Sequence, residues 1–253
     1  MGRVISVSNQ KGGVGKTTTT VNVASFIADR ARRVLVVDID PQANAGYGVG
    51  INAGESERTI YEVLIGTVPI RDAIVKTGLE NLDLIPSNIH LAGAQMDLMD
   101  VDGKEFILRR AMQEIRGDYD YVFIDCPPSL GILTLNSLVA ADSVMIPLQC
   151  EYYALEGLSQ LLRIIAMVQE NLNKALAIEG VVLTMYDSRT NLSQQVVSDV
   201  REYFSNKVFK TIIPRNVRLS EAPSFGKPIG FYDRGSIGSV TYENLADEVL
   251  KNG

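Results

Sequence analysis

The stretch Lys11-Gly12-Gly13-Val14-Gly15-Lys16-Thr17-Thr18 lies between an apolar run at residues 4–8 and a segment that we expect to be helical, residues 17–31. A strand, a glycine-rich loop and a helix in this order are the context of a phosphate-binding loop. The glycines let several backbone N–H groups point into one concavity, where the helix N-terminus adds the positive end of its dipole. The stretch therefore predicts a nucleotide site, in which Lys16 reaches the β- and γ-phosphates and the Thr17 hydroxyl is a ligand of Mg²⁺.

The loop departs from the general pattern G-x-x-x-x-G-K-[ST] at its first position, where Gln10 replaces glycine, and Lys11 adds a second lysine. The resulting form, K-G-G-x-G-K-T, resembles the deviant Walker A loop of the ParA/MinD family of ATPases. The resemblance implies an ATP-sandwich homodimer in which Lys11 crosses the interface to the partner's nucleotide. Such a cation would offset the charge that develops near the γ-phosphate, as an arginine finger does. We therefore expect Lys11 and Lys16 to be catalytic, and the nucleotide to be bound by Lys11, Gly12, Gly13, Val14, Gly15, Lys16, Thr17 and Thr18.

The length and composition of the chain fit a single α/β domain. Strand and helix signals alternate along all 253 residues without a linker, so we expect one domain, 1–253, and the hydrophobic content of 46% is enough for a sizeable core. No apolar run approaches the length of about 18 residues that a membrane-spanning helix needs. The two cysteines make neither a disulfide framework nor a zinc pattern, and the N-terminus has no signal-peptide pattern. These features predict a cytoplasmic protein without a membrane partner.

The order of the expected elements predicts the fold class. Expected strands are 34–38, 82–85, 121–125, 144–148, 180–184 and 208–214, and expected helices are 60–65, 70–76, 105–116, 155–168, 192–204 and 236–251. Strands that alternate with helices imply right-handed βαβ units. We therefore expect an α/β, single-domain P-loop NTPase fold, with a mostly parallel twisted sheet and helices on both faces. Ligands of such sheets bind beyond the C-terminal ends of the strands.

Three aspartates follow apolar strands and are the candidate groups around the metal. Asp125 ends the run Tyr-Val-Phe-Ile-Asp, a Walker B arrangement in which the carboxylate holds Mg²⁺ directly or through a water. Asp38 and Asp40 lie in D-x-D-P-Q, which resembles the switch I segment of the ParA/MinD family. The resemblance implies that Asp40 orients or deprotonates the attacking water and that Asp38 supports the magnesium shell. Many relatives have glycine where this chain has Ala43.

The segment that follows the strand at 208–214 is the candidate adenine site. It offers the flat ring of Pro214 and the planar guanidinium of Arg215. The resemblance implies that Pro214 and Asn216 contact the base and that Met185 packs near it. ATP, rather than GTP, is the expected nucleotide, because the family uses ATP and the chain has no N-K-x-D guanine motif.

The resemblance extends over nearly the whole chain. Residues 186–192, 214–223 and 226–229 look like the Soj-type ParA proteins of bacterial chromosome and plasmid partition. The resemblance to these proteins implies an ATP-bound dimer that binds nucleoid DNA without sequence preference. It also implies a slow ATPase activity, which a ParB-type centromere-binding protein accelerates. The chain enters its first strand at once, so we expect the short ParA type, which lacks an N-terminal helix-turn-helix domain and operator-specific binding.

The distribution of charge agrees with contact to a polyanion. Residues 201–234 hold seven Lys or Arg and three acids, a net charge of +4. The whole chain has a net charge of −6, so the residues outside this window have a net charge of −10. A basic patch on an acidic body suits DNA, whose phosphates are contacted without regard to sequence. By resemblance, Arg189 and Arg218 are the main candidate DNA contacts, and weaker candidates are Lys207, Lys210 and Arg215. Ile237 stands where many relatives have arginine.

Three alternatives stay open at this point. The same ATPase switch could position another cargo, such as a chemosensory array or a microcompartment. A membrane-associated ATPase of the MinD kind needs a basic amphipathic C-terminal helix, whereas residues 242–253 are acidic. A reductase like the nitrogenase iron protein needs a pair of cluster-ligating cysteines near the dimer axis, and Cys126, directly after Asp125, is poorly placed for that role.

Overall fold

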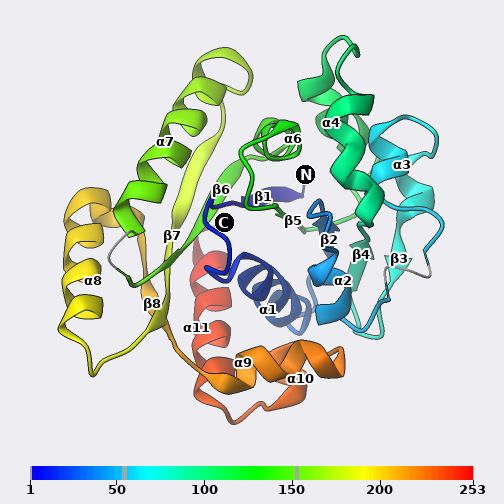
Figure 1. Cartoon of the computed structure of the whole chain (residues 1–253). Coiled ribbons are helices and arrows are strands. Elements are labelled where there is room, and N and C mark those ends of the chain that lie inside the picture. The colour runs from blue at the N-terminus through cyan, green and yellow to red at the C-terminus, as the bar shows by residue number, and fades with distance from the viewer. Residues whose placement is uncertain (1, 53–55, 152–153, 253) are drawn as a thin grey trace.

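The computed structural model describes residues 2–52, 56–151 and 154–252, and within them the strands form one sheet in the order β3-β4-β2-β5-β1-β6-β7-β8 (Figure 1). Neighbouring strands are parallel, except that β3 is antiparallel to β4. The strands are β1 (Arg3–Val7), β2 (Val34–Asp38), β3 (Val75–Lys76), β4 (Leu82–Ile85), β5 (Tyr121–Asp125), β6 (Ser143–Gln149), β7 (Ala177–Tyr186) and β8 (Val208–Pro214).

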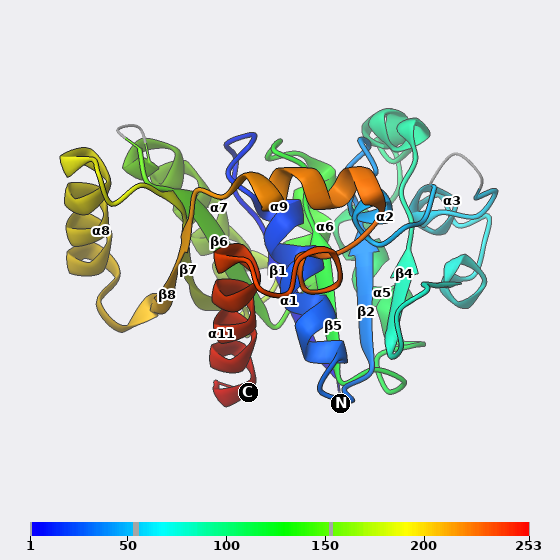
Figure 2. The ribbon, with the colours of Figure 1, turned by 90° about the horizontal axis from the view of Figure 1, so that it is seen from below.

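Helices cover both faces of the sheet, as Figures 1 and 2 show. One face carries α3 (Ile60–Leu64), α4 (Ala94–Asp97), α5 (Ile107–Met112), α6 (Ile132–Ala140), α7 (Ala154–Asn171) and α8 (Asn191–Phe204). The other carries α1 (Lys16–Ala28), α2 (Asn44–Gly48), α9 (Val217–Glu221), α10 (Ile229–Tyr232) and α11 (Ile237–Lys251). Short 3-10 segments are η2 (Ile70–Ala73), η3 (Ile89–Gly93), η4 (Lys104–Phe106), η5 (Ser205–Lys207) and η6 (Ala222–Phe225). No helix of the described ranges is long and apolar enough to span a membrane.

The side chains of the strands alternate between two hydrophobic cores. In β2, Leu35 and Val37 pack into the core under α3–α8, whereas Val34 and Val36 pack into the core under α1 and α11. All five residues of β2 are buried, which is why the sequence reads as a continuous apolar run instead of an alternating one. The prediction of a mostly parallel α/β sheet with helices on both faces is therefore confirmed.

Several element boundaries differ from the expected ones. The segment 70–76 forms the short η2 and strand β3 instead of a helix. The helix expected at 105–116 is shorter in the structure, where it consists of the 3-10 segment η4 followed by α5, which ends at Met112. Helix α6 was not expected: most of its residues are buried, so the sequence has no polar stripe to show helical periodicity. The first helix ends at Ala28, and Ala31 has a left-handed φ of 56°. In α7, Leu158, Leu161, Ile165 and Val168 are buried as expected, whereas the side chain of Leu155 lies outside the described residues.

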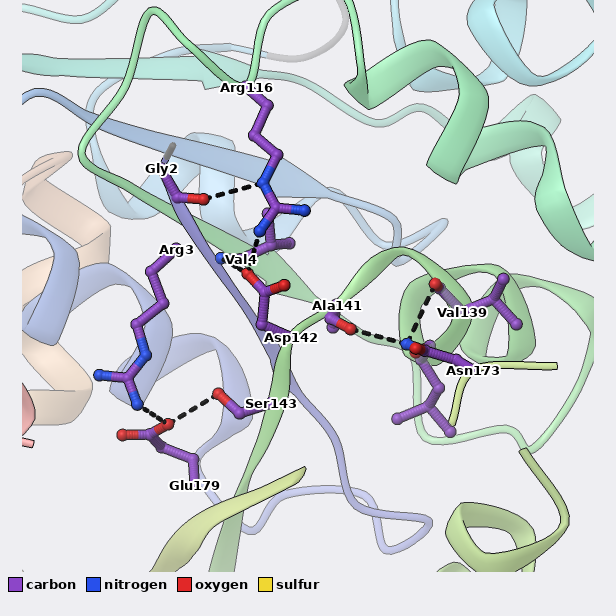
Figure 3. Close-up of polar contacts among 11 residues, drawn as sticks. Gly2, Arg3, Val4, Arg116, Val139, Ala141, Asp142, Ser143, Asn173 and Glu179 are labelled. Carbon is purple, nitrogen blue, oxygen red and sulfur yellow. Dashed lines mark hydrogen bonds and ion pairs between the residues drawn. The ribbon is translucent and has the colours of Figure 1, made fainter. Parts of the chain in front are cut away.

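Polar contacts tie together the N-terminal ends of the central strands, opposite the end that carries the predicted site (Figure 3). The Asp142 carboxylate accepts from the Val4 N–H at 2.8 Å and from the Arg116 guanidinium. The buried Glu179 carboxylate accepts from the Arg3 guanidinium at 2.6 Å and from the Ser143 hydroxyl at 2.7 Å. Because buried charges need partners to be tolerated, these contacts fix how β1, β6 and β7 are aligned.

Asn173→Ala is expected to lower the free energy of unfolding by about 2–3 kcal/mol, because it leaves buried carbonyl groups without a donor. The buried Asn173 amide donates to the carbonyl oxygens of Leu138, Val139 and Ala141, at 3.1, 3.2 and 2.8 Å (Figure 3). Urea unfolding followed by circular dichroism measures the loss. Asn171→Ala removes one exposed amide contact to the Met167 carbonyl and is the control; equal stability of the two variants would contradict the prediction.

Candidate nucleotide and magnesium site

The loop between β1 and α1 has the backbone geometry of an anion site. Gly13 and Gly15 have φ values of 75° and 89°, in the left-handed region that glycine adopts without strain. Gly15 is the N-cap of α1, and no side chain caps that end of the helix. The first N–H groups of a helix have no intrahelical acceptor, so an anion bound beside Gly15 would satisfy them. The loop therefore fits the phosphates of a nucleotide.

Side chains outside the predicted set hold this loop against the sheet. The Asn9 amide donates to the Pro147 carbonyl at 2.7 Å, and its oxygen accepts from the Lys11 N–H at 3.0 Å. The Thr184 hydroxyl donates to the Val14 carbonyl at 2.9 Å. The sequence carries no motif for Asn9 or Thr184, because both contacts join residues more than 130 positions apart.

The two lysines of the loop lie in different surroundings. Lys16 is buried, and its ammonium donates to the Lys11 carbonyl at 3.0 Å. Burial lowers the pKa of Lys16, although Asp125 acts in the opposite direction. Lys11 is half-exposed and forms an ion pair with Glu151 of the same chain. Lys16 thus points its charge into the site, whereas Lys11 sits at the rim, where its present partner is a carboxylate.

The candidate metal-site residues lie close together where α1 begins and where β2 and β5 end, and they are Thr17, Asp38 and Asp125. Asp38 and Asp125 are register partners at the ends of β2 and β5, and the Thr17 hydroxyl donates to Asp125 at 2.7 Å. The Thr20 hydroxyl, which sequence reasoning missed, lies 3.0 Å from the other oxygen of Asp125.

The electrostatics of these carboxylates favour a cation. Burial raises the pKa of Asp125 to about 6, and burial together with the nearby charge of Asp125 raises the pKa of Asp38. Hydroxyl and carboxylate oxygens are the ligands that Mg²⁺ prefers. Among the described residues, no group of three or more His, Cys, Asp and Glu could hold a metal by itself. In proteins Mg²⁺ is usually bound by one or two carboxylates together with waters and substrate phosphates.

Asp40 faces the same site from a loop that Asp38 organises. The two oxygens of Asp38 accept from the N–H groups of Asp40 and Ala45, both at 3.0 Å. Asp40 in turn accepts from the Gln42 N–H at 3.0 Å and lines a cavity of about 330 Å³ with the phosphate loop. Ala43 has a left-handed φ of 54°, which costs a non-glycine residue about 1 kcal/mol. A glycine at this position would avoid that strain.

A second cavity of about 240 Å³ adjoins the first and holds the expected adenine residues. Both cavities are lined by Gly15, Thr18 and Met185. Pro214, Arg215 and Asn216 line the second one, and Asn216 also caps α9 by accepting from the Arg218 N–H at 2.8 Å. Met185 has a φ of 51°, a strained value that positions its side chain between the two cavities.

The predicted DNA contacts are divided between two ends of the sheet. The Arg215 N–H donates to the Tyr186 carbonyl at 3.0 Å, which brings Arg215 beside the loop of Arg189 at the nucleotide end. Arg189 is exposed and pairs with Asp187, and Arg218 pairs with Glu221 and Asp233. Lys207 precedes β8 and Lys210 lies near its start, so Lys207 is about 26 Å from Arg215 along the extended chain.

The fold and this site define a P-loop ATPase with two lysines in its phosphate loop. A family model described as "AAA domain" matches residues 2–178. The chain is 56% identical over its whole length, and over the whole length of the relative, to the sporulation initiation inhibitor protein Soj of Bacillus subtilis. It is 55% identical to the chromosome partitioning protein ParA of Myxococcus xanthus, covering 99% of this chain and 89% of the relative. The chain therefore belongs to the Soj/ParA family of chromosome-partitioning ATPases.

Solved structures agree with this assignment of the fold and of the nucleotide. A protein from Mycobacterium smegmatis named cobyrinic acid a,c-diamide synthase, with bound ADP and magnesium, is 41% identical, with a TM-score of 0.87 over 99% of this chain and 95% of that one. The cell division ATPase MinD of Pyrococcus furiosus is 26% identical, with a TM-score of 0.82 over 100% of both chains. The chain is thus an ATPase that uses ATP and Mg²⁺, with the MinD/ParA P-loop fold.

Proposed function

We propose that this chain is an ATP-dependent dimerising switch that binds DNA without sequence preference and positions a chromosome or plasmid. The observation that carries the proposal is that one short segment both lines the expected adenine cavity and carries basic side chains on the surface. Pro214, Arg215, Asn216 and Pro223 line the adenine cavity, and the same short stretch carries Arg215 and Arg218, both of which are exposed. A change at the nucleotide can therefore alter the surface that meets DNA.

The residues of the site suggest how hydrolysis is carried out. Bound ATP supplies the phosphorus that is attacked, and Mg²⁺ neutralises charge on its phosphates. Asp40 holds a water and accepts its proton, while Lys16 and the N–H groups at the start of α1 stabilise negative charge on the leaving oxygens. Thr17, Asp38 and Asp125 orient the metal side of the site. We assign these roles because Lys16, Thr17 and Asp40 line the cavity, Asp125 accepts from the Thr17 hydroxyl, and Asp38 is the register partner of Asp125.

Lys11 is the group that makes dimerisation part of the proposal. It sits at the rim of the site with its charge balanced by Glu151. In a dimer that faces two such sites toward each other, Lys11 exchanges that carboxylate for the partner's nucleotide. Hydrolysis then ends the dimeric state, and a ParB-type protein accelerates it, as the Soj/ParA family implies.

The basic side chains suit phosphate contacts that depend on salt. Arg189 and Arg218 are paired with acids on the surface, and exposed ion pairs contribute little to stability, so exchanging them for DNA phosphates costs little. Each phosphate contact that forms releases counterions and makes binding weaker at higher salt. We therefore favour Arg189, Arg215 and Arg218 as the DNA-contacting residues.

Arg189→Glu is expected to weaken ATP-dependent binding to duplex DNA of arbitrary sequence at least tenfold, while ATP-dependent dimers persist, because a phosphate contact becomes a repulsion. Arg218→Glu is expected to do the same. Fluorescence anisotropy with a labelled duplex measures the affinity, and light scattering measures the dimer. Lys207→Glu, the same charge reversal at the far end of β8, is the control; unchanged DNA affinity in both arginine variants would place the DNA surface elsewhere.

Two other assignments are less well supported. Binding to a membrane through the C-terminal helix would need a free apolar face, but Tyr242, Leu245, Ala246 and Val249 of α11 are buried in the core. The name of the M. smegmatis protein belongs to that protein, and several relatives with higher identity over nearly the full chain are named as chromosome-partitioning proteins. Positioning of another cargo by the same switch differs from our proposal in the partner protein alone.

A further inference from the structure

Two glycines from distant parts of the chain bring the loop after α2 against the turn after η6. Gly50 has a φ of 80° and Gly226 a φ of 64°. A Cβ on Gly226 would lie 2.9 Å from the Cα of Gly50, and a Cβ on Gly50 would lie 3.0 Å from the Gly226 carbonyl oxygen. The two backbones thus touch without a side chain between them, and neither position accepts a larger residue without displacement.

The Gly50 side of this contact leads to the catalytic loop. Asp38 holds the first turn of α2 through the Ala45 N–H at 3.0 Å. The end of α2 is closed by hydrogen bonds from the Gly50 N–H to the Tyr47 carbonyl and from the Ile51 N–H to the Gly46 carbonyl, at 3.2 and 2.9 Å. A displacement of the loop that carries Asp38 and Asp40 is therefore passed to Gly50 through one short hydrogen-bonded unit.

The Gly226 side leads to the basic surface. The Gly226 N–H donates to the Pro223 carbonyl at 3.0 Å, and the Lys227 N–H donates to the Ala222 carbonyl at 3.3 Å, so the glycine is part of the turn that follows η6. Helix α9 with Arg218 precedes η6 directly. Figure 2 shows this orange segment reaching α2, and α2 contacts η6.

A cavity of about 260 Å³ lies beside the contact, between α2 on one side and the η6 segment on the other. Asn44 and Tyr47 line it from the α2 side, Pro223 and Lys227 line it from the other, and Thr17 of the phosphate loop also borders it. A direct backbone contact next to a cavity lets the two segments push on each other at one point and leaves space for them to move.

We propose that the Gly50–Gly226 contact couples the nucleotide to DNA: the position of the Asp38–Asp40 loop sets the position of the segment with Arg218 and Lys227. This inference rests on the proposed DNA-binding function. Coupling between two ligands is reciprocal, so DNA has to change the affinity for an ATP analogue by the same factor by which the analogue changes the affinity for DNA.

The test compares Gly226→Ala and Gly50→Ala with Gly66→Ala. Gly66 also has a left-handed φ, of 77°, but a Cβ there would have nothing within 4 Å, so this control carries the same backbone strain without the contact. The quantity measured is the ratio of affinities for a labelled duplex with a non-hydrolysable ATP analogue and with ADP. We expect Gly66→Ala to keep the wild-type ratio, and each of the other variants to lower it at least fivefold, with affinity for the analogue in the absence of DNA within threefold of wild type.

The outcomes separate this inference from the function on which it rests. A wild-type ratio in both contact variants would overturn the coupling while leaving the DNA-binding switch in place. Loss of analogue binding in these variants would also overturn it, because the contact would then support the pocket itself. A wild-type protein whose DNA affinity ignores the nucleotide would overturn the proposed function. Thermal unfolding shows whether each variant is folded. If Gly226→Ala does not fold, Gly50→Ala tests the same contact from the other side.

Discussion

Lys16→Ala lowers the affinity for ATP by about 100-fold in our account, because two charge-assisted hydrogen bonds to phosphate are lost at about 1.5 kcal/mol each. Lys16 is buried beside the loop, and its ammonium has the neutral Lys11 carbonyl as its hydrogen-bond acceptor. A charged group in that position binds an anion strongly, since water does not screen it well. Titration with a fluorescent ATP analogue measures the affinity.

The control for this prediction is Lys104→Ala, which removes a lysine that contacts the Met99 carbonyl away from the site. Circular dichroism has to show that both variants are folded. An ATP affinity of the Lys16 variant within threefold of the control would mean that this loop does not bind the phosphates.

Asp40→Ala is expected to reduce ATP hydrolysis by about 10²–10⁴-fold, the usual contribution of a positioned acid or base, with little change in ATP affinity. Asp40 lines the phosphate cavity, and among the described residues the Gln42 N–H is the hydrogen-bond donor to its carboxylate. The variant should therefore stay in the ATP-bound dimer and remain on DNA. Phosphate release measures hydrolysis, and DNA anisotropy with ATP follows the bound state over time.

Asp72→Ala is the matched control for Asp40, since Asp72 is an exposed carboxylate whose ion-pair partner is Arg58. Wild-type turnover by the Asp40 variant would remove this residue from the catalytic role. Loss of ATP binding together with hydrolysis would make it a support of the loop, comparable to Asp38.

The sequence predicted those parts of the site that depend on short motifs and on strand ends. Asp38 and Asp125 were expected to meet because the C-terminal ends of parallel strands share one edge of a sheet, and the register of β2 and β5 places them side by side. Lys16 and Thr17 were identified from the glycine pattern. In the structure Lys16, Thr17 and Asp40 line one cavity, and Asp125 lies next to it through its hydrogen bond with Thr17. The chemical roles of these residues stay predictions.

Long-range contacts could not be predicted in the same way. Asn9, which precedes the phosphate loop, bonds to Pro147 of β6, and Thr184 of β7 bonds to Val14 of the loop. No local pattern marks such pairs. The charge of residues 201–234 indicated a basic surface, but the window could not show that β8 carries Lys207 and Arg215 to opposite ends of the sheet. Helix α6 was missed because burial on most of its sides removes the periodicity that identifies a surface helix.

The central claim is that ATP switches the chain into a DNA-binding dimer. The most direct measurement is the affinity of the wild-type protein for a duplex of arbitrary sequence, with ATP and Mg²⁺, with ADP and Mg²⁺, and without nucleotide, at low and at moderate salt, with light scattering on the same samples. Our account predicts dimers and DNA binding with ATP alone, and weaker binding as salt rises. Equal DNA affinity in all three nucleotide states, or no DNA binding by a protein that still hydrolyses ATP, would contradict it.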